Sequence, residues 1–508
     1  MNRGGDATLA DEPEFAGTQR EALRSSMIVG GAQVVVIAAG LIRTKVAALI
    51  LGPAGIGLIA LFQTIVQTAS NLAAFGIGTA GPQQIAAAAG DPERQLRARY
   101  ALTALTLAAA VLGGGATWLA REQISQWVFG DRAHASQIGW LALAVALTVV
   151  TVGQNALLIG LRRIGDAARL GVFSAVAASI IGVAAIWWLR DDGLLWFVFA
   201  TPLAMAVVAA ALIARLPRWR GSRRPTAEHR QALRTLARLG AAFVLAGVAG
   251  SLGQLAIRSV IQTSLGLDAV GHFQAAWFIS MTYVGFVLAA MGADYYPRLS
   301  AIAADRAAAN RLVDEQTELA LLLAGPALLA TLGLAPFVIQ LLYSREFGPA
   351  AAILRWQVLA DLAKVAAYPL GYLLLAQGRA WTFMALEIGI NVVMVAGVAL
   401  LIPTFGLPAT GVAVLIGYGA YLVALLAIVG AGAGYRWSQS NRRLALGLAA
   451  GSATVFALGE IEVWIGGGVG VAAALAMATM SYARLEHALP DALTTRVRAI
   501  MRSVSRGH

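Results

Sequence analysis

Fourteen apolar segments, separated by gaps that are alternately rich and poor in arginine, constrain this chain more than any other feature. A helix needs about 20 mostly apolar residues to cross a bilayer, because lipid cannot satisfy backbone hydrogen bonds. With 59% hydrophobic and 13% charged residues in 508 positions, the chain is predicted to be an all-α polytopic membrane protein with about 14 transmembrane helices. The expected helices are 26–50, 56–79, 100–120, 138–160, 168–189, 194–214, 238–262, 269–292, 316–343, 352–376, 381–402, 408–434, 443–459 and 464–482.

Positive charge is divided unevenly between the two sets of gaps. Of the 38 lysine and arginine residues, 29 lie in the termini and even-numbered gaps and five within the helices. The other four lie in odd-numbered gaps, at Arg121, Arg132, Arg190 and Arg345. Because positively charged loops stay in the cytoplasm, both termini are expected there. The charge of +12 thus follows membrane topology, and we expect no nucleic acid partner.

A glycine-containing turn recurs after 214 residues and predicts an internal repeat. LGPAGIG begins at Leu51 and LGLDAVG begins at Leu265, and Asp91 matches Asp305 at the same offset. Two turns that each need glycine would give a similar pattern without a repeat. We expect two pseudo-symmetric six-helix lobes with a substrate site between them, as in alternating-access transporters. The expected parts are a disordered cytoplasmic leader (1–25), an N-lobe (26–214), a basic linker (215–238), a C-lobe (239–434), two extra helices (435–482) and a basic cytoplasmic tail (483–508).

Charged residues within the predicted helices are candidates for function, because ionisable groups in hydrocarbon cost about 2.5–3.5 kcal/mol on insertion scales. The set is net positive and comprises Arg43, Lys45, Arg258, Arg355, Asp361, Lys364 and Glu387. Arg43 and Arg355 have an equally good explanation as side chains that snorkel to the interface. A cationic cleft between lobes would suit an anion, since arginine and lysine hold phosphates by charge-assisted hydrogen bonds.

Polar stripes on three apolar helices predict a water-filled cleft. Residues three or four apart share a helix face, and the stripes are Gln63, Gln67 and Asn71; Thr148, Thr151 and Asn155; and Ser251, Gln254 and Arg258. Under the repeat, Arg258 corresponds to Thr44, between Arg43 and Lys45. Those two cations are about 200° apart around a helix, so at most one faces the cleft.

Three charged residues near the middle of the C-lobe are candidates for coupling or gating. Asp361 and Lys364 are one helical turn apart, and either neutralise each other as a structural pair or form a gate in which Asp361 accepts a proton. Glu387 is either a second coupling carboxylate or a residue near the cytoplasmic rim.

Several enzyme classes are disfavoured. The chain has no GxxxxGK[ST] loop for ATP hydrolysis, no nucleophile elbow and no cysteine, and its five histidines do not form a metal pattern. No outer gap is long enough for the catalytic loop that a membrane glycosyltransferase or polymerase needs. We therefore expect a non-enzyme without catalytic residues, cofactor or metal.

Five stretches resemble bacterial O-antigen flippases, and most of all the subgroup that moves the lipid-linked enterobacterial common antigen repeat. They are WQVLADLAKVAAYPLGY at 356–372, LGPAGIGL at 51–58, GQNALLIGLRRIGDA at 153–167, YYPRLSAI at 295–302 and LIPTFGLPATGVA at 401–413. This family belongs to the superfamily of multidrug extruders, lipid II flippases and polysaccharide exporters. The resemblance implies a V-shaped bundle that translocates undecaprenyl-pyrophosphate-linked oligosaccharide from the cytoplasmic to the periplasmic leaflet.

The resemblance also implies roles for particular residues. Asp361 and Lys364 match acidic and basic positions of the family, while Gln63 stands where relatives often carry arginine and Met281 where an acidic residue can occur. The lipid bilayer and the lipid-linked saccharide are the expected partners. The two extra helices would pack peripherally or dock a polymerase or chain-length protein. The alternatives are a cation-coupled extruder of drugs or metabolites, which the net cationic interior disfavours, and a non-transporting scaffold, which would have no reason to keep charges at mid-membrane.

Overall fold

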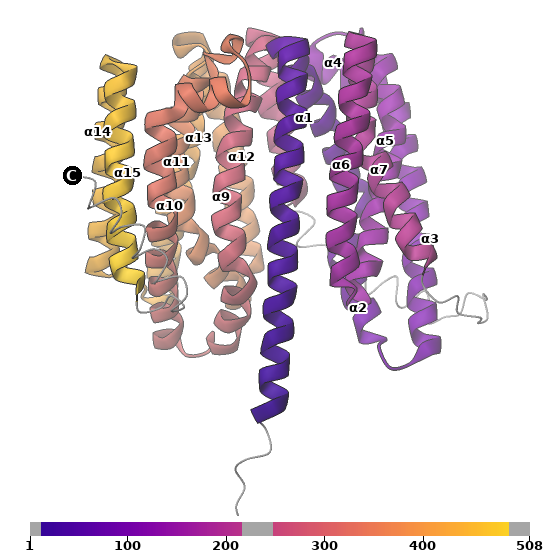
Figure 1. Ribbon diagram of the computed structural model, residues 1–508, viewed down its shortest axis with the longest axis horizontal. Coiled ribbons are helices and arrows are strands. Elements are labelled where there is room, and N and C mark those ends of the chain that lie inside the picture. The colour runs from indigo at the N-terminus through magenta and orange to yellow at the C-terminus, as the bar shows by residue number, and fades with distance from the viewer. Residues whose placement is uncertain (1–11, 216–246, 487–508) are drawn as a thin grey trace, which may run out of the picture. The chain divides into compact units, whose positions relative to one another are not determined.

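The computed structural model describes residues 12–215 and 247–486, and these residues form helices and turns with no strand among them (Figure 1). They divide into two compact units. Unit 1 comprises residues up to Gly271 together with Leu342–Ser344, and unit 2 comprises His272–Leu341 and the residues from Arg345 onwards. The predicted basic linker, apart from Arg215, and most of the basic tail lie outside the described residues.

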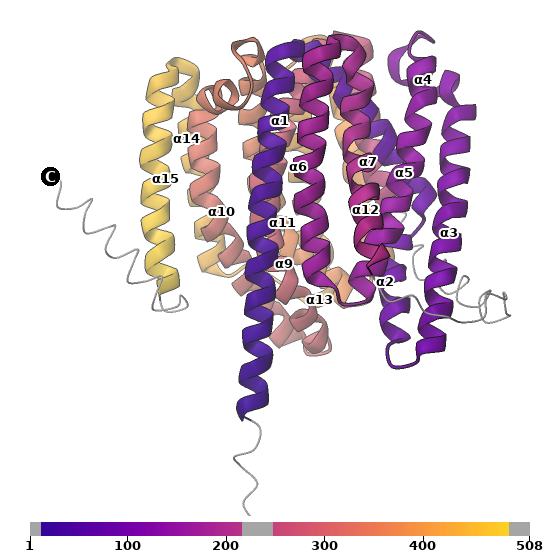
Figure 2. The ribbon, with the colours of Figure 1, turned by 45° about the vertical axis from the view of Figure 1, so that its right-hand side comes forward.

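The helices of unit 1 are α1 (Glu12–Ala74), α2 (Ile77–Ala87), α3 (Pro92–Leu119), α4 (Arg121–Phe129), α5 (Ala135–Gly160), α6 (Ile164–Leu189), the 3₁₀ turn η1 (Arg190–Asp192), α7 (Gly193–Ala214) and a helix over 247–265. Those of unit 2 are α9 (Leu267–Ile302, whose first turn lies in unit 1), α10 (Arg306–Leu342), the 3₁₀ turn η2 (Arg345–Phe347), α11 (Ala350–Ala376), α12 (Ala380–Phe405), α13 (Ala409–Ala433), α14 (Gln439–Ile461) and α15 (Val463–Leu485). Within unit 1, α6 lies beside α7 and α3 beside α5 (Figure 2).

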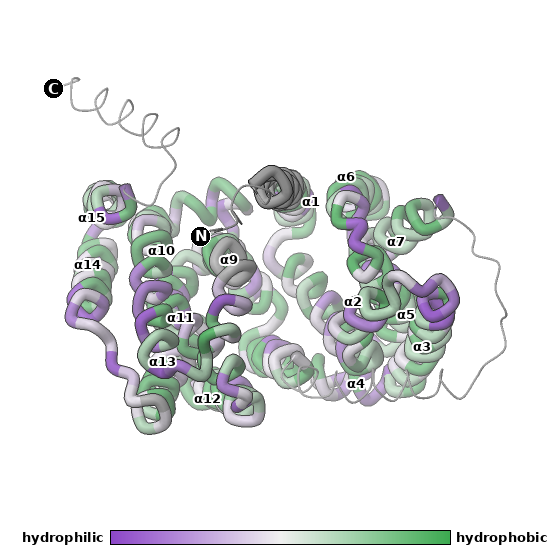
Figure 3. The backbone as a smooth tube through the Cα atoms, turned by 90° about the horizontal axis from the view of Figure 1, so that it is seen from below, coloured by the Kyte–Doolittle hydropathy of each residue, from purple (hydrophilic) through white to green (hydrophobic). Residues whose placement is uncertain are grey.

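The chain is a multi-pass membrane protein. Ten helical stretches of the described residues are long and apolar enough to cross a bilayer, and two of these, Gly31–Ala74 and Ile164–Ala214, have 44 and 51 residues. At 1.5 Å per residue each is long enough for two crossings. Most of the helices consist largely of hydrophobic residues, and hydrophilic residues are concentrated at the turns (Figure 3). Large side chains such as Trp188 (79% exposed) and Leu400 (76%) lie on the surface, as expected for contact with lipid.

The first two predicted helices are continuous in α1, with a kink at Gly52. This residue has φ 64° and ψ −168°, a conformation that glycine adopts readily because it has no Cβ. Pro53 follows and cannot donate the backbone hydrogen bond of a continuing helix. The predicted turn therefore exists, but as a kink within one long element.

The predicted repeat is present in the backbone. Gly266, which is 214 residues after Gly52, also has positive φ (85°) and separates the helix over 247–265 from α9. Asp91 accepts a hydrogen bond from Arg94 N at the start of α3, and Asp305 accepts one from Ala308 N at the start of α10. Equivalent carboxylates therefore cap equivalent helices.

The correspondence continues later in the chain at an offset of 216 residues. Arg162 and Gly378 both have positive φ in the turns that precede α6 and α12. Arg190 (φ 51°, ψ −122°) and Gly406 (φ 60°, ψ −140°) end those same helices. Only one residue of each pair is a glycine, so a comparison of the residue types does not reveal this half of the repeat.

The two repeated turns pack against each other within unit 1. A Cβ added to Gly57 would lie 2.2 Å from the carbonyl oxygen of Leu267, and one added to Gly271 would lie 2.0 Å from that of Pro53. Since Leu267 and Gly271 are the repeat equivalents of Pro53 and Gly57, the contact is reciprocal. This close approach explains why these positions carry glycine.

The structure differs from the predicted parts of the chain at several places, including Leu342–Ser344 of the predicted C-lobe, which belong to unit 1. The helix over 247–265, expected to begin the C-lobe, belongs to unit 1, where Ser259 Oγ donates to Trp127 O at 2.9 Å. Residues 12–25, expected to be a disordered leader, are helical in α1. These residues include good helix formers, and extending an existing helix avoids the cost of a new nucleus. Residues 1–11 lie outside the described part of the chain.

The two extra helices belong to unit 2 and lie at its edge, where they pack closely against their neighbours (Figure 1). Gly333 of α10 meets α15 closely enough that an added Cβ would lie 2.7 Å from Gly466 O. At one end of α14, Asn441 Nδ2 donates to Asp314 Oδ1 at 2.8 Å. Small residues allow such close packing in a membrane, where burying apolar surface does not drive helices together.

Candidate functional site

Two of the predicted polar stripes meet in unit 1. On α1, Gln67 Nε2 donates to Asn71 Oδ1 at 2.7 Å, and Asn71 Nδ2 donates to Ser251 Oγ at 2.6 Å. Thr68 Oγ1 also donates to Ser251 O at 3.2 Å. Gln63 is exposed one turn earlier on α1. Periodicity predicted each stripe, and the structure joins the stripes of α1 and the helix over 247–265.

Arg258 is buried on the helix that carries Ser251. Its Nη1 donates to Gln254 Oε1 at 2.7 Å and to Gln254 O at 3.1 Å. These two bonds to Gln254 orient the guanidinium along its own helix. The predicted pairing of Gln254 and Arg258 on one helix face is therefore present in the structure.

Arg43 binds within unit 1. Its Nη1 donates to Thr201 Oγ1 at 2.6 Å, Nη2 donates to Phe197 O, and the guanidinium lies 3.8 Å from the centre of the Phe197 ring. Gly182 of α6 leaves room for it, since an added Cβ would lie 2.9 Å from Nε. These contacts join α1 to α6 and α7 and favour a structural role for Arg43, in place of substrate binding or snorkelling.

The other unit 1 candidates lie apart from this contact. Lys45 Nζ donates to Tyr343 O at 3.3 Å, in the short segment that follows α10. Asn155 is half-buried on α5. Arg43 and Lys45 reach different neighbours, as their positions around the helix predicted.

Asp361 of α11 is buried in unit 2 and accepts two hydroxyl hydrogen bonds from α9. Ser280 Oγ donates at 2.8 Å and the Tyr283 hydroxyl donates to the same carboxylate oxygen, Oδ2. Such charge-assisted bonds stabilise a carboxylate away from water. The described residues contain no ion pair between Asp361 and Lys364, so the direct structural pair considered from the sequence is absent.

Lys364 lies one turn further along α11. Its Nζ is 2.8 Å from Met281 Sδ and 5.3 Å from the centre of the Tyr418 ring. Thioether sulfur is a weak acceptor, and an aromatic face attracts a cation only modestly. The carboxylates that act on Lys364 electrostatically, Asp361 and Glu387, each accept hydroxyl hydrogen bonds.

Glu387 of α12 is half-buried, and the Tyr421 hydroxyl donates to its Oε1 at 2.6 Å. Asn391 Nδ2, one turn further along α12, donates to Glu387 O at 2.8 Å. The structure therefore places Asp361, Lys364 and Glu387 in one electrostatic cluster between α9, α11, α12 and α13.

Arg355 lies on α11 but binds α14. Its Nη1 pairs with Glu460 Oε1 at 2.6 Å, Nη2 donates to Phe456 O, and the guanidinium lies 4.5 Å from the centre of the Phe456 ring. An added Cβ on Gly459 would lie 2.5 Å from Nη2, so glycine makes room for this contact. Arg355 therefore links an extra helix to the helix that carries Asp361, which favours a structural role over substrate binding.

The sequence analysis missed the tyrosines that surround this cluster. On α11 itself, Tyr368 and Tyr372 continue the stripe of Asp361 and Lys364 at four-residue spacing, and their hydroxyls are 3.3 Å apart. The spacing was readable from the sequence, whereas the partners Tyr283, Tyr418 and Tyr421 come from other helices and could not be assigned by periodicity. Half-buried tyrosines offer both ring faces and hydroxyls to a ligand.

No group of three or more His, Asp or Glu residues in the described ranges could hold a metal ion. The chemistry of the two clusters is that of charge and hydrogen bonding: a guanidinium on a polar stripe in unit 1, and an ammonium beside hydroxyl-capped carboxylates in unit 2.

Comparison with known proteins agrees with this architecture. Residues 22–303 match the family model described as polysaccharide biosynthesis protein. The chain is 25% identical over 388 residues to the lipid III flippase of Escherichia coli strain K12, an alignment that covers 75% of this chain and 92% of that protein. An equal match is the lipid III flippase of Shigella flexneri.

Solved structures share the fold. The lipid II flippase MurJ in an inward closed conformation has a TM-score of 0.68 at 13% identity, covering 90% of this chain and 99% of that one. An inward-facing multidrug resistance MATE family transporter has a TM-score of 0.66 at 19% identity, covering 82% and 96%. The fold is therefore that of two-lobe membrane transporters, and the family match, which spans more than half of the chain, shows that this protein belongs to the polysaccharide biosynthesis protein family.

Proposed function

We propose that this protein is a flippase that moves undecaprenyl-diphosphate-linked oligosaccharide repeat units from the cytoplasmic to the periplasmic leaflet of the bacterial inner membrane. The observation that carries the proposal is the environment of Lys364. This ammonium has a thioether and an aromatic ring as its near contacts, while the neighbouring carboxylates are occupied by hydroxyl donors. A cation held in this way within a membrane protein can accept an anionic group such as a diphosphate.

Arg258 supplies a second cation, in unit 1. Gln254 orients its guanidinium, and the polar stripe of Gln67, Asn71 and Ser251 lies on the same helix and its neighbour. Guanidinium groups match phosphate geometry with paired donors, and amide and hydroxyl groups suit sugar hydroxyls. We propose that Arg258 in unit 1 and Lys364 in unit 2 each bind the diphosphate at a stage of the transport cycle.

The family and its named relatives support the same function. The lipid III flippase of Escherichia coli aligns over 92% of its length, and the MurJ fold belongs to another lipid-linked substrate carrier. Both are transporters, and we propose no catalytic activity for this chain. Contacts with a polymerase or chain-length protein, and cytoplasmic termini, remain predictions.

A cation-coupled extruder of drugs is the alternative, because MATE transporters share the fold. An extruder of organic cations needs carboxylates that are free to bind them. Here the candidate charged residues of the predicted helices are five cations and only two carboxylates, and both carboxylates already accept hydroxyl hydrogen bonds, so the balance of charge favours an anionic substrate.

The membrane potential is a sufficient driver in this proposal. Moving negative charge outward is favoured by an inside-negative potential, at about 2.3 kcal/mol per charge per 100 mV. A diphosphate diester carries two such charges, so Asp361 need not transfer a proton in each cycle.

The test is transport by the purified protein in liposomes. A diphosphate-linked polyprenyl oligosaccharide placed in one leaflet is probed by a glycosidase added to the opposite side, and efflux of an organic cation is measured in parallel. Protein-dependent exposure of the oligosaccharide without cation efflux supports the proposal. Cation efflux without oligosaccharide exposure would assign the chain to the extruders.

A further inference from the structure

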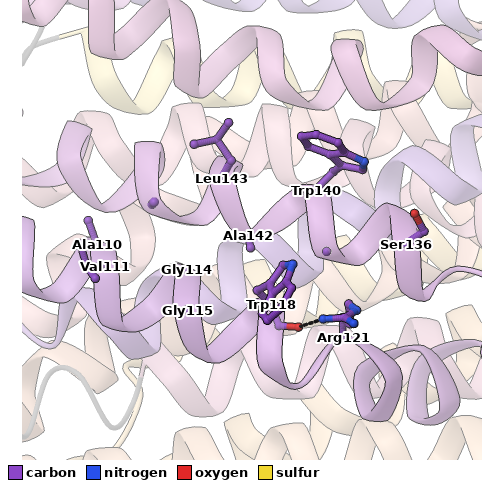
Figure 4. A pocket seen from close by; sticks show the side chains of 12 residues that line it. Ala110, Val111, Gly114, Gly115, Trp118, Arg121, Ser136, Trp140, Ala142 and Leu143 are labelled. Atoms are coloured by element: carbon purple, nitrogen blue, oxygen red, sulfur yellow. Dashed lines mark hydrogen bonds between the residues drawn. The ribbon is translucent and has the colours of Figure 1, made fainter.

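A groove of about 690 Å³ lies between α3 and α5 within unit 1, and its lining includes no residue of the two charged clusters (Figure 4). Its walls include Trp118 of α3 and Trp140 of α5, which are 51% and 63% exposed. Gly114 and Gly115 contribute to its lining without side chains. Small residues on two adjacent helices thus leave a recess on the apolar surface.

The groove changes from polar to apolar along its length. At one end, where α3 ends and α5 begins, it is lined by Arg121 and Ser136; about 10–15 Å further into the helices it is lined by Val111 and Leu143. The arginine distribution predicts that the polar end lies at the non-cytoplasmic surface of the membrane. Tryptophan is enriched at such membrane–water interfaces. A lipid oriented like its neighbours in the same leaflet would place its polar headgroup at the polar end of the groove and its acyl chain at the apolar end.

Arg121 lies at the polar end of the groove, and most of its N–H hydrogen-bond donors are available to a ligand. Its Nη1 donates to Trp118 O at 3.1 Å, and its guanidinium lies 4.3 Å from the centre of the Trp118 ring. A guanidinium has five N–H donors, so this bond occupies one of them. The nearby Glu122 pairs with Arg132 at 3.4 Å, and no ion pair of the described residues includes Arg121.

We propose that this groove binds an anionic glycerophospholipid, with the phosphodiester on Arg121 and an acyl chain along the floor between Trp118 and Trp140. The charge of the site decides the occupant. One guanidinium neutralises the single charge of a phosphodiester, whereas a diphosphate would require further cations that the groove does not contain. The site is thus a lipid site separate from the proposed translocation pathway.

The glycine floor provides a variant that fills the groove without disturbing the fold. A Cβ added to Gly115 would meet no atom within 4 Å, so Gly115→Leu extends into open space and replaces a poor helix former. Gly447 of α14 is also exposed with no atom within 4 Å, and Gly447→Leu is its matched control on another membrane helix. Arg132→Gln controls for Arg121→Gln, since Arg132 does not line the groove.

The experiment uses the absence of cysteine from the chain. Leu112, which is 72% exposed and adjacent to Val111 of the groove lining, is changed to Cys and labelled with bimane in the full-length protein. Quenching is measured in mixed micelles as phosphatidylglycerol or phosphatidylcholine with brominated acyl chains is added. We expect phosphatidylglycerol to quench at about tenfold lower concentration, the factor that corresponds to about 1.4 kcal/mol.

Arg121→Gln should abolish this preference and Gly115→Leu should weaken quenching by both lipids, while Arg132→Gln and Gly447→Leu should match the parent. Equal quenching by the two lipids in the parent would mean annular lipid only and overturn the proposal. Unchanged preference in Arg121→Gln would also overturn it. If undecaprenyl diphosphate displaces phosphatidylglycerol at lower concentration than unlabelled phosphatidylglycerol does, the groove belongs to the diphosphate lipid instead.

Discussion

The ammonium of Lys364 lies 2.8 Å from the sulfur of Met281, across the contact between α11 and α9. The resemblance to O-antigen flippases marks position 281 as one where an acidic residue can occur. A carboxylate there would form an ion pair with Lys364, and methionine instead leaves the ammonium available to a substrate anion.

Met281→Glu should therefore reduce transport of the lipid-linked oligosaccharide. The new carboxylate would compete with the diphosphate for Lys364, and we expect a fall of about tenfold, equivalent to about 1.4 kcal/mol. Initial rates in liposomes measure it, with Met281→Gln as the matched neutral control. Parent-like transport by Met281→Glu would show that Lys364 does not bind the substrate.

The hydroxyl pair on Asp361 should stabilise unit 2. Tyr283→Phe and Ser280→Ala each remove one hydrogen bond to a buried carboxylate, which is worth about 1.5–3 kcal/mol. Thermal unfolding in detergent should show a lower midpoint for both variants. Tyr100→Phe, at an exposed position of α3, is the control. Unchanged midpoints would mean that these hydroxyls do not hold Asp361 in the folded protein.

Arg355→Ala should lower stability rather than substrate affinity. The change removes the ion pair, the bond to Phe456 O and the ring contact between α11 and α14, with an expected loss of about 1.5–3 kcal/mol. Glu460→Gln should cost about 0–1 kcal/mol, because Glu460 is 61% exposed. Thermal midpoints and oligosaccharide binding are measured together. A loss of oligosaccharide binding at an unchanged thermal midpoint would show that Arg355 binds the substrate.

The two glycines at the reciprocal contact of the repeated turns should not tolerate replacement by a residue with a side chain. Gly57→Ala and Gly271→Ala would place a Cβ 2.2 and 2.0 Å from backbone carbonyl oxygens, so we expect little folded protein from either. Gly40→Ala on the same helix as Gly57 meets no atom within 4 Å and should be neutral or stabilising by up to about 1 kcal/mol. Monodisperse yield after detergent extraction measures all three. Normal yield of Gly57→Ala would mean that the two turns do not approach as described.

Much of the fold could be predicted because the length of each apolar segment and the arginine content of each gap can be read from contiguous stretches of the sequence. Each of the fourteen predicted segments overlaps a helix of the structure, and the 214-residue repeat appears in the positive φ of Gly52 and Gly266. The short α2 and α4 were missed, since elements of 11 and nine residues carry no membrane signal.

Tertiary partners were less predictable. Spacing placed Asp361 and Lys364 on one face of α11, but it could not show that Ser280 and Tyr283 take the carboxylate. Nor could it show that Arg43 and Arg355 bind carbonyl oxygens and aromatic rings of neighbouring helices. A buried arginine looks the same in a sequence whether its partner is a substrate or another helix.

The central claim is that cations in the membrane carry an anionic lipid-linked saccharide, and transport by Arg258→Ala and Lys364→Ala in liposomes tests it most directly. Arg132→Ala, a surface arginine paired with Glu122, is the control, and all proteins are compared at equal inserted amounts. We predict that the parent and Arg132→Ala translocate the oligosaccharide, and that the other two variants are at least about tenfold slower. Parent-like rates for both Arg258→Ala and Lys364→Ala would contradict the account.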